Sequence, residues 1–401
     1  MDYDVIIVGA GPAGSSAAIR LAENGLRVLV LEEKRMPREK LCGEFITPES
    51  FPTLKRLAVF DRMLAAGAQK LTRLCLVASG GRVVHVPIAE MSYESAWAMS
   101  LSRARFDQIL FARARELGAT CLEGVAVKQP LYENDKPCGV EALNLADGQT
   151  MRFTARLIVD ASGRNSRLLL SRSERIAGER GSRLYALKAH LAAVEGIDEQ
   201  VELFFFPQGY GGLSRVEGGL VNLCFIAGER TFKEAGGDHN EVVRRSIMKN
   251  RLARERLASS EVVGKWHSVG PLAFGHRRLS RGGIIAIGDA SGMIDPFTGT
   301  GIQIALRTGE IAAEAISDHL SDSRDITDAT GRILAAYQKS YDREFNNRMM
   351  IAGLLRGAAF SPRSANLLAG LFARVPWVAR RVLKATRSGN SLTELGQYRE
   401  R

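Results

Sequence analysis

The stretch that decides the fold is residues 4–33, DVIIVGAGPAGSSAAIRLAENGLRVLVLEE. Its first apolar run, Asp4–Val8, is typical of a strand and leads into the pattern G-x-G-x-x-G at residues 9–14. A helical pattern follows to Asn24, and a second strand-like run, Leu26–Leu31, ends in two acidic residues. This order of strand, glycine loop, helix, strand and acid predicts a Rossmann-like unit that binds an adenine dinucleotide.

Each glycine of the loop has its own physical task in that interpretation. Gly9 makes the tight turn, Gly11 lets the backbone approach a pyrophosphate, and Gly14 lets helix and strand pack closely. Pro12 and Ala13 begin the helix, whose N-terminus offers unpaired N–H groups and a partial positive charge to the phosphates.

The acidic end of the second strand is the next part of the predicted site. Glu32 is placed to accept hydrogen bonds from the adenosine ribose hydroxyls, and Glu33 follows it at the same strand end. The loop and the acids do not distinguish NAD from FAD, whereas segments further along the chain do.

A glycine-rich segment in the last third of the chain favours FAD. The strand-like run 283–287 leads into GDASGMIDPFTGTG at residues 288–301, and a helical pattern follows from Ile302. Asp289, at the end of a buried strand, is placed to hold a ribityl hydroxyl. The turn Gly299–Gly301 opens a helix whose N-terminal dipole stabilises negative charge on a reduced isoalloxazine.

Two shorter motifs lie between these segments. Residues 157–166, LIVDASGRNS, form a strand pattern that ends in a D-A-S-G turn. Residues 100–107, SLSRARFD, begin an amphipathic helix in which Arg103 is placed to reach the cofactor phosphates.

Together these motifs resemble those of the flavoprotein superfamily with the p-hydroxybenzoate hydroxylase-type fold. The resemblance covers roughly residues 1–320 and implies one non-covalently bound FAD. The fold class that it implies is α/β (α+β): a Rossmann-like, glutathione-reductase-type FAD-binding domain, an inserted antiparallel-sheet substrate domain and a C-terminal helical segment. The residues expected to bind FAD are Gly9, Gly11, Pro12, Ala13, Gly14, Glu32, Glu33, Lys40, Cys42, Gly43, Arg103, Val125, Ala161, Ser162, Gly163, Gly288, Asp289, Pro296, Gly299, Thr300, Gly301 and Ile302.

The expected domains are discontinuous in sequence. The FAD-binding domain comprises residues 1–71, 98–165 and 271–333, the substrate-binding domain residues 72–97 and 166–270, and the helical segment residues 334–401. Alternating hydrophobic and polar residues predict strands at Leu184–Ala192, Gln200–Phe206, Leu220–Ile226 and Glu261–Val269, and a basic helix at Asn240–Leu257.

Two further segments resemble one branch of this superfamily, the geranylgeranyl reductase family. Residues 37–44, PREKLCGE, are similar to that family's P…K-x-C-G segment, and residues 206–213, FPQGYGGL, to its glycine–tyrosine strand. The family saturates isoprenoid double bonds with electrons from NADPH, ferredoxin or another reduced carrier. The chain departs from the pattern at Glu44, where the family has a second glycine, and at Ser214–Glu217, where it often has an aromatic residue and a proline.

The leading hypothesis is therefore an FAD-dependent oxidoreductase that reduces C=C bonds of a hydrophobic, lipid-like substrate with hydride from flavin N5. The reaction also needs a proton donor within reach of the substrate carbon. Cys42, Glu44 and Tyr210 are the candidates for this catalytic role. The alternatives are that Cys42 packs as a small apolar side chain, that Glu44 is a solvated carboxylate and that Tyr210 only packs its ring.

Three other functions stay open. A flavin monooxygenase that hydroxylates an aromatic, quinone or polyketide substrate through a C4a-hydroperoxyflavin rests on analogy of fold. Aromatic hydroxylases of this fold usually carry a histidine after G-D-A, where this chain has Ser291 and Gly292. A halogenase is more distant, because the W-x-W-x-I-P motif of flavin-dependent halogenases is absent. A flavoprotein electron carrier, the non-enzymatic alternative, would need an exposed flavin edge rather than an enclosed pocket.

Composition and charge limit the partners and the compartment. The formal net charge is +11, but the basic residues are scattered, so nucleic acid is not an expected partner. Five cysteines without C-x-x-C spacing, and histidines without ligand spacing, predict neither a metal site nor disulfides, which fits a cytoplasmic location. No signal-peptide pattern is seen, and no apolar run approaches the ~18–20 residues of a membrane span.

An electron donor and a membrane are the remaining expected partners. No second G-x-G-x-x-G follows a strand, so NAD(P)H would bind transiently at the surface of the FAD-binding domain, and a reduced protein carrier is the alternative donor. Residues 364–387 combine an apolar face with basic positions and are interrupted by Pro376. That pattern suits a helix in peripheral contact with the anionic inner membrane face. The same pattern is more often that of a helix packed on the FAD-binding domain.

Overall fold

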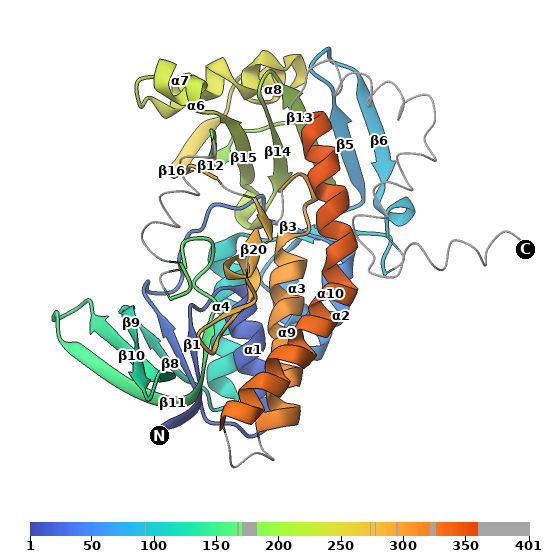
Figure 1. The fold of residues 1–401 in the computed structure, drawn as a ribbon. Helices are drawn as coiled ribbons and strands as arrows, with labels where there is room; N and C mark the ends of the chain where they lie inside the picture. The colour runs from blue at the N-terminus through green and yellow to red at the C-terminus, as the bar shows by residue number, and fades with distance from the viewer. Residues whose placement is uncertain are drawn as a thin grey trace, which may run out of the picture.

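The computed structural model describes residues 1–92, 94–166, 168–170, 183–272, 274–276, 278–293, 296–320 and 326–359. Over these residues the chain forms two layered parts, one built on a mostly parallel sheet and the other on a mostly antiparallel sheet. The parallel-sheet part lies below the antiparallel sheet in Figure 1, and helix α10 (Ile326–Ala359) runs alongside both.

The lower part contains an eight-stranded sheet whose central strands are parallel. The strand order is β18-β19-β11-β1-β2-β8, and β10 and β9 continue from β11 as an antiparallel extension. The strands are β1 (Tyr3–Val8), β2 (Val28–Glu32), β8 (Thr120–Glu123), β9 (Val125–Glu133), β10 (Lys136–Asn144), β11 (Thr150–Asp160), β18 (Ser280–Arg281) and β19 (Ile284–Ala286).

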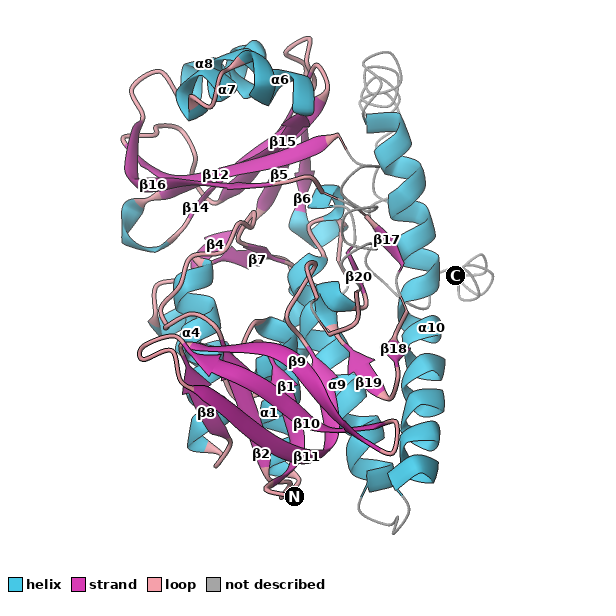
Figure 2. Ribbon diagram, turned by 60° about the vertical axis from the view of Figure 1, so that its left-hand side comes forward, coloured by secondary structure: helices cyan, strands magenta, loops and turns pink. Residues whose placement is uncertain are grey.

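Both faces of the parallel strands are covered, which explains the continuous apolar runs Val5–Val8 in β1 and Val28–Leu31 in β2. Val5 and Val28 point to one face and pack on α1 (Pro12–Glu23), α4 (Arg103–Glu116) and α9 (Gly301–Leu320). Their chain neighbours Ile6 and Leu29 point to the other face, where the β9–β10 hairpin covers them (Figure 2). The glycine loop therefore lies at one end of a fully buried sheet.

The upper part contains a seven-stranded sheet in the order β16-β12-β15-β14-β13-β5-β6, in which only the β13–β5 pair is parallel. Helices α6 (Glu229–Glu234), α7 (His239–Arg245) and α8 (Arg251–Arg256) cover its outer face. Its inner face is turned toward the glycine loop. The strands are β5 (Arg73–Val77), β6 (Val83–Pro87), β12 (Leu184–Ala192), β13 (Gln200–Phe206), β14 (Gly209–Arg215), β15 (Val221–Gly228) and β16 (Glu261–Val269).

Short elements connect the two parts. A three-stranded sheet of β3 (Phe45–Ile46), β7 (Ala98–Ser100) and β4 (Gln69–Leu71) lies between the larger sheets, and β17 (Gly275–His276) pairs with β20 (Gly292–Met293). The remaining elements are helices α2 (Phe51–Arg56) and α3 (Phe60–Ala65), and 3₁₀ turns η1 (Pro48–Ser50), η2 (Ile88–Glu90), η3 (Glu217–Gly219), η4 (Ile247–Lys249), η5 (Gly288–Ala290) and η6 (Pro296–Thr298). Among the described residues, no helix combines the length and apolarity needed to cross a bilayer.

The predicted strands at 184–192, 200–206 and 261–269 are confirmed, and the fourth is shifted to Val221–Gly228. The single basic helix predicted at 240–257 is wrong, because the chain breaks into α7, η4 and α8. The break has a polar cause. The Asn250 side chain caps α8 and also donates to the carbonyl oxygens of Val77, Ala78 and Phe205 on the sheet.

The C-terminal helix begins at Ile326, earlier than the boundary expected at residue 334. It packs along α9 through Tyr337, Tyr341 and Phe345, which are all buried in the main core. The predicted interfacial segment at 364–387 lies outside the described residues.

Helices α9 and α1 approach each other closely in the FAD-binding part. A Cβ added at Gly309 would lie 2.3 Å from the Ala13 carbonyl oxygen and 3.0 Å from the Ala17 nitrogen, both in the α1 backbone. Only glycine allows this approach, so the middle of α9 lies directly against the first turns of α1.

Replacing Gly309 with alanine should therefore cost about 1–3 kcal/mol of unfolding free energy, because one backbone has to move away from the other. The matched control is Gly331→Ala in α10, where an added Cβ meets nothing within 4 Å. That variant should be stabilised by about 0.5–1 kcal/mol, the ordinary gain from removing glycine from a helix interior. Urea denaturation followed by circular dichroism measures both, and equal midpoints for the two variants would contradict this account of the contact.

Candidate active site

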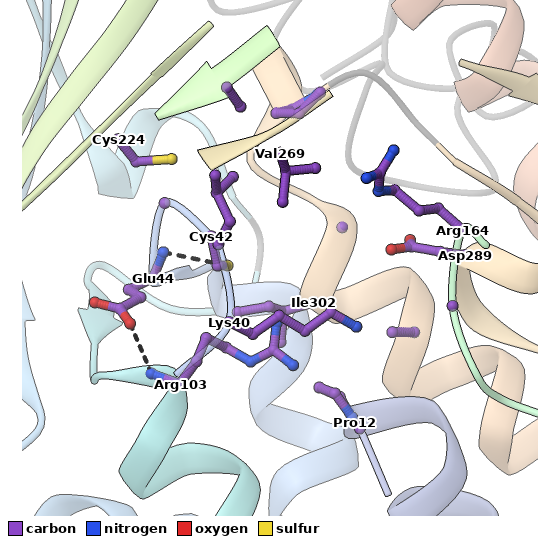
Figure 3. A pocket seen from close by; sticks show the side chains of 18 of the residues that line it. Pro12, Lys40, Cys42, Glu44, Arg103, Arg164, Cys224, Val269, Asp289 and Ile302 are labelled. Atoms are coloured by element: carbon purple, nitrogen blue, oxygen red, sulfur yellow. Dashed lines mark hydrogen bonds between the residues drawn. The ribbon is translucent and has the colours of Figure 1, made fainter. Parts of the chain in front are cut away.

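A cavity of about 970 Å³ extends from the glycine loop to the inner face of the seven-stranded sheet (Figure 3). It is lined by the ends of β1 and β2, by the loop after β2, by the turn η5 that follows β19, and by β12, β14, β15 and β16. Of the residues predicted for the site, Gly14 and Thr300 are not part of the lining. The predicted residues that line it are Gly9, Gly11, Pro12, Ala13, Glu32, Glu33, Lys40, Cys42, Gly43, Glu44, Arg103, Val125, Ala161, Ser162, Gly163, Tyr210, Gly288, Asp289, Pro296, Gly299, Gly301 and Ile302.

The glycine loop has the geometry of a phosphate cradle. Gly9 has a φ of 103°, and a Cβ there would lie 2.6 Å from the Ala161 carbonyl oxygen. A Cβ at Gly14 would lie 2.0 Å from the Gly9 carbonyl oxygen, so Gly14 is needed for packing and does not face the cavity. Gly11 is open to the cavity and is the N-cap of α1 without a side-chain cap, which leaves the first-turn N–H groups for an anion.

A buried carboxylate, Asp107, holds two guanidinium groups beside this cradle. Its Oδ2 accepts hydrogen bonds from Arg38 Nη1 at 2.9 Å and Arg103 Nη2 at 2.7 Å, and its Oδ1 accepts from Arg103 Nε at 2.7 Å. Burial opposes the charge of Arg103, but Asp107 outweighs that effect and raises the pKa of the guanidinium. Arg103 therefore stays charged at the edge of the cavity, and the Nη2 atoms of Arg38 and Arg103 lie 3.8 and 4.0 Å from a Cβ at Gly11.

Glu32 is joined to the same network. Its Oε2 accepts from the Ala10 N–H at 2.9 Å and from Arg38 Nη2 at 3.3 Å, and its Oε1 accepts from the Lys34 N–H at 3.0 Å. The carboxylate is thus fixed at the end of β2 and turned toward the cavity. Arg38 and Asp107 were not identified from the sequence, although the spacing of Arg103 and Asp107, four residues apart on a helix, was a usable signal.

The D-A-S-G turn and the segment after β19 complete the polar end. Asp160 is fully buried and accepts hydrogen bonds from the Ser162 N–H at 2.9 Å and from the Ser162 Oγ at 2.6 Å. Burial raises the pKa of this carboxyl, and its role is to shape the turn. Lys40 and Asp289 both line the cavity, and the pKa of Lys40 is lowered mainly by burial and then by Arg103.

Glu44 is the largest departure from expectation in this site. The alternative of a solvated carboxylate is wrong: its side chain is fully buried and accepts from the Arg103 N–H at 2.7 Å, from Lys188 Nζ at 2.5 Å and from His190 Nε2 at 2.7 Å. Burial works against ionisation, but the His190 hydrogen bond and Lys188 outweigh it, so the pKa of Glu44 lies below its usual value. An ionised carboxylate with both oxygens engaged is poorly suited to donate a proton, and Lys188 and His190 had no sequence signal.

The other two catalytic candidates lie where the cavity becomes apolar. Cys42 is half-buried, lines the cavity, and accepts a hydrogen bond from the Glu44 N–H at 3.3 Å (Figure 3). Tyr210 is almost fully buried, with its ring edge-on to Phe297 at 5.7 Å. The apolar end around it is formed by Leu41, Leu74, Leu76, Ala186, Leu203, Ile226, Val269, Leu272, Met293 and Phe297.

Fold and site together define a class of protein, a dinucleotide-dependent oxidoreductase with one cofactor cradle that opens into an apolar chamber. The chain belongs to the FAD binding domain family, whose model matches residues 2–339. The protein is therefore an FAD-dependent oxidoreductase, as the sequence motifs predicted.

Several known proteins are similar to the chain. It is 29% identical over 366 residues to digeranylgeranylglycerophospholipid reductase 2 of Methanopyrus kandleri, which covers 88% of this chain and 85% of that protein. It is 29% identical over 383 residues to menaquinone reductase of Mycobacterium tuberculosis, covering 90% and 85%. A more distant relative, at 23% over 377 residues, is a 1H-pyrrole-2-carbonyl peptidyl-carrier-protein chlorinase of Pseudomonas fluorescens, covering 85% and 82%.

Among solved structures, a geranylgeranyl bacteriochlorophyll reductase-like protein of Thermoplasma acidophilum has a TM-score of 0.78, covers 98% of both chains and is 19% identical. This likeness confirms the fold class.

Replacing Glu32 with alanine should weaken FAD binding by roughly 1–3 kcal/mol, because a charged hydrogen-bond acceptor at the end of β2 is lost. Titration of the apoprotein with FAD, followed by flavin fluorescence, gives the change in Kd. Glu133→Ala, at an exposed position of β9, is the matched control and should leave Kd unchanged. An unaltered Kd for the Glu32 variant would remove this residue from the cofactor site.

Proposed function

We propose that the protein is a reductase that uses FAD to saturate C=C bonds in a long apolar substrate of the prenyl type. The observation that carries this proposal is the continuity of the cavity. One end has the charges and backbone N–H groups that a dinucleotide needs, and the other end is walled by aliphatic and aromatic side chains. A reduced cofactor and an apolar chain are thereby given adjoining places in one cavity.

The residues present fit FAD. The uncapped start of α1 with Arg103 and Lys40 suits the pyrophosphate, Glu32 suits the adenosine ribose, and Asp289 suits a ribityl hydroxyl. The segment 296–302 at the start of α9 would face the flavin ring. When bound, FAD supplies two-electron hydride chemistry, while the protein supplies position, charge and exclusion of water.

Cys42 is the proton donor that we propose. It lies between the charged end and the apolar end of the cavity, and two groups fix it: the Glu44 N–H contacts its Sγ, and Asn222 Nδ2 donates to its carbonyl oxygen at 3.1 Å. Tyr210 is proposed to orient the substrate, because its ring is packed among apolar side chains. Glu44 is not proposed as a proton donor, because both oxygens of its carboxylate accept hydrogen bonds.

Two of the relatives support the apolar substrate, since their names specify reductases of a geranylgeranyl lipid and of menaquinone. We propose NAD(P)H or a reduced protein carrier as the electron donor. In this proposal the enzyme is cytoplasmic and takes its lipid from the inner membrane face.

The experiment that tests the reaction is anaerobic incubation of the dithionite-reduced holoenzyme with a geranylgeranyl lipid, followed by mass spectrometry of the product. The expected product is heavier by two hydrogen atoms for each reduced double bond. Under aerobic conditions with NADPH, a product heavier by one oxygen atom would establish a monooxygenase instead, and incorporation of halide would establish a halogenase.

Replacing Cys42 with alanine should abolish product formation but leave reduction of the bound flavin intact, because only the proton donor is lost. Cys224→Ala is the matched control. Its thiol also lines the cavity, but burial raises its pKa strongly, and its removal should leave turnover near that of the wild type. Full turnover in the Cys42 variant would contradict the proton-donor role and would show that the Cys42 side chain only packs.

A further inference from the structure

Four side chains from two distant segments form an ionic cluster around two buried members, Glu44 and Lys188, and it is here called the Glu44 cluster. Glu39 and Glu44 come from the loop after β2, and Lys188 and His190 come from β12. Lys188 Nζ lies 2.7 Å from Glu39 Oε2 and 2.5 Å from Glu44 Oε1, and His190 Nε2 lies 2.7 Å from Glu44 Oε2. Glu44 and Lys188 are almost entirely shielded from solvent, so neither charge is stable without the other.

The cation of the Glu44 cluster is a side chain of the protein, the Lys188 ammonium. The ligand atoms of Glu39, Glu44 and His190 lie within 4.8 Å of one another, a spacing that a metal ion can occupy. The Lys188 ammonium already bridges the two carboxylates, however, and it also donates to the Lys40 carbonyl oxygen at 3.3 Å. With its three N–H groups used in this way, Lys188 joins the loop after β2 to the seven-stranded sheet.

The pKa shifts of Lys188 and Glu44 both favour the ionised form of the pair. Burial opposes the charge of Lys188, but Glu44 and Glu39 outweigh it and raise its pKa. The pKa of Glu44 is lowered by His190 and Lys188 against the effect of burial. Near neutral pH the pair therefore stays ionised.

The cluster is connected to Cys42 through the backbone of Glu44. Glu44 has a backbone φ of 55°, which is unfavourable for any residue other than glycine. The hydrogen bonds of its carboxylate hold the residue in this conformation. In this conformation the Glu44 N–H points at Cys42 Sγ, while the carboxylate accepts from the first N–H of α4 at Arg103 (Figure 3). The Cys42 thiol also lies beside the Arg103 guanidinium.

We propose that Glu44 and Lys188 are positioning residues that hold the Cys42 thiol at the boundary between the polar and apolar ends of the cavity. For its effect on turnover the proposal rests on the function proposed above, whereas the position of the thiol can be tested separately. Lys188 and His190 do not line the cavity over the residues that the structure describes, so they act on it only through the loop.

The test uses the FAD-loaded Lys188→Met variant, which removes the cation at similar side-chain size. The rate of Cys42 alkylation by iodoacetamide, measured by peptide mass spectrometry, should rise about fivefold or more as the loop loses its link to β12. In the reductase assay kcat should fall about tenfold or more while KM changes little, because the substrate contacts remain and only the donor is displaced. Lys339→Met, at an exposed position of α10, is the matched control and should change neither.

The two readouts separate the two proposals. An alkylation rate within about twofold of the wild type would overturn the positioning role, whatever the activity. Faster alkylation with unchanged kcat would support positioning and overturn the role of Cys42 in the reaction. Should Lys188→Met fail to fold, Glu44→Gly replaces it, because glycine accepts a φ of 55° while removing the carboxylate. An unchanged alkylation rate in that variant would equally overturn the proposal.

Discussion

The geometry of the cavity depends on one buried carboxylate. Glu44 lies in the loop after β2. Its carboxylate oxygens nevertheless accept hydrogen bonds from the first N–H of α4 and from two side chains of β12 in the seven-stranded sheet. A buried ion is stable only while its partners stay in place, so these contacts have to form together. The carboxylate thereby links the seven-stranded sheet to the glycine-loop domain, and the cavity lies between these two parts.

Much of the fold follows from local patterns in the sequence. The apolar runs beside G-x-G-x-x-G, the alternation of 200–206 and the long helical pattern after Gly301 each specify an element without reference to distant residues. The break at Asn250 was not visible, because it depends on carbonyl groups of three residues elsewhere in the chain. Helical periodicity continues through that position, and only tertiary hydrogen bonds interrupt it.

The candidate site likewise contains residues that the sequence predicted and residues that it did not. The cradle residues were found because backbone geometry demands particular residue types at fixed spacing, as at Gly9 and Gly14. The charged partners were not found, since an ion pair such as Glu44 with Lys188 joins residues 144 positions apart and leaves no local pattern. The sequence therefore allowed Glu44 as a proton donor or as a solvated carboxylate, and neither interpretation included its ion pair with Lys188.

The division of the cavity into two ends bears on why one fold serves several reactions. The cradle end suits the cofactor that the FAD binding domain family implies, and proteins named as reductases and as a chlorinase are both similar to this chain. In the function proposed here, the apolar end would set which substrate fits. In the function proposed here, the reaction would depend on the short segment between the ends, Cys42–Glu44, where a polar group lies next to the apolar end. A proton donor held in a fixed position loses little free energy to reorganisation. Proton transfer from Cys42 would therefore depend on how firmly that segment is anchored by Glu44 and Lys188.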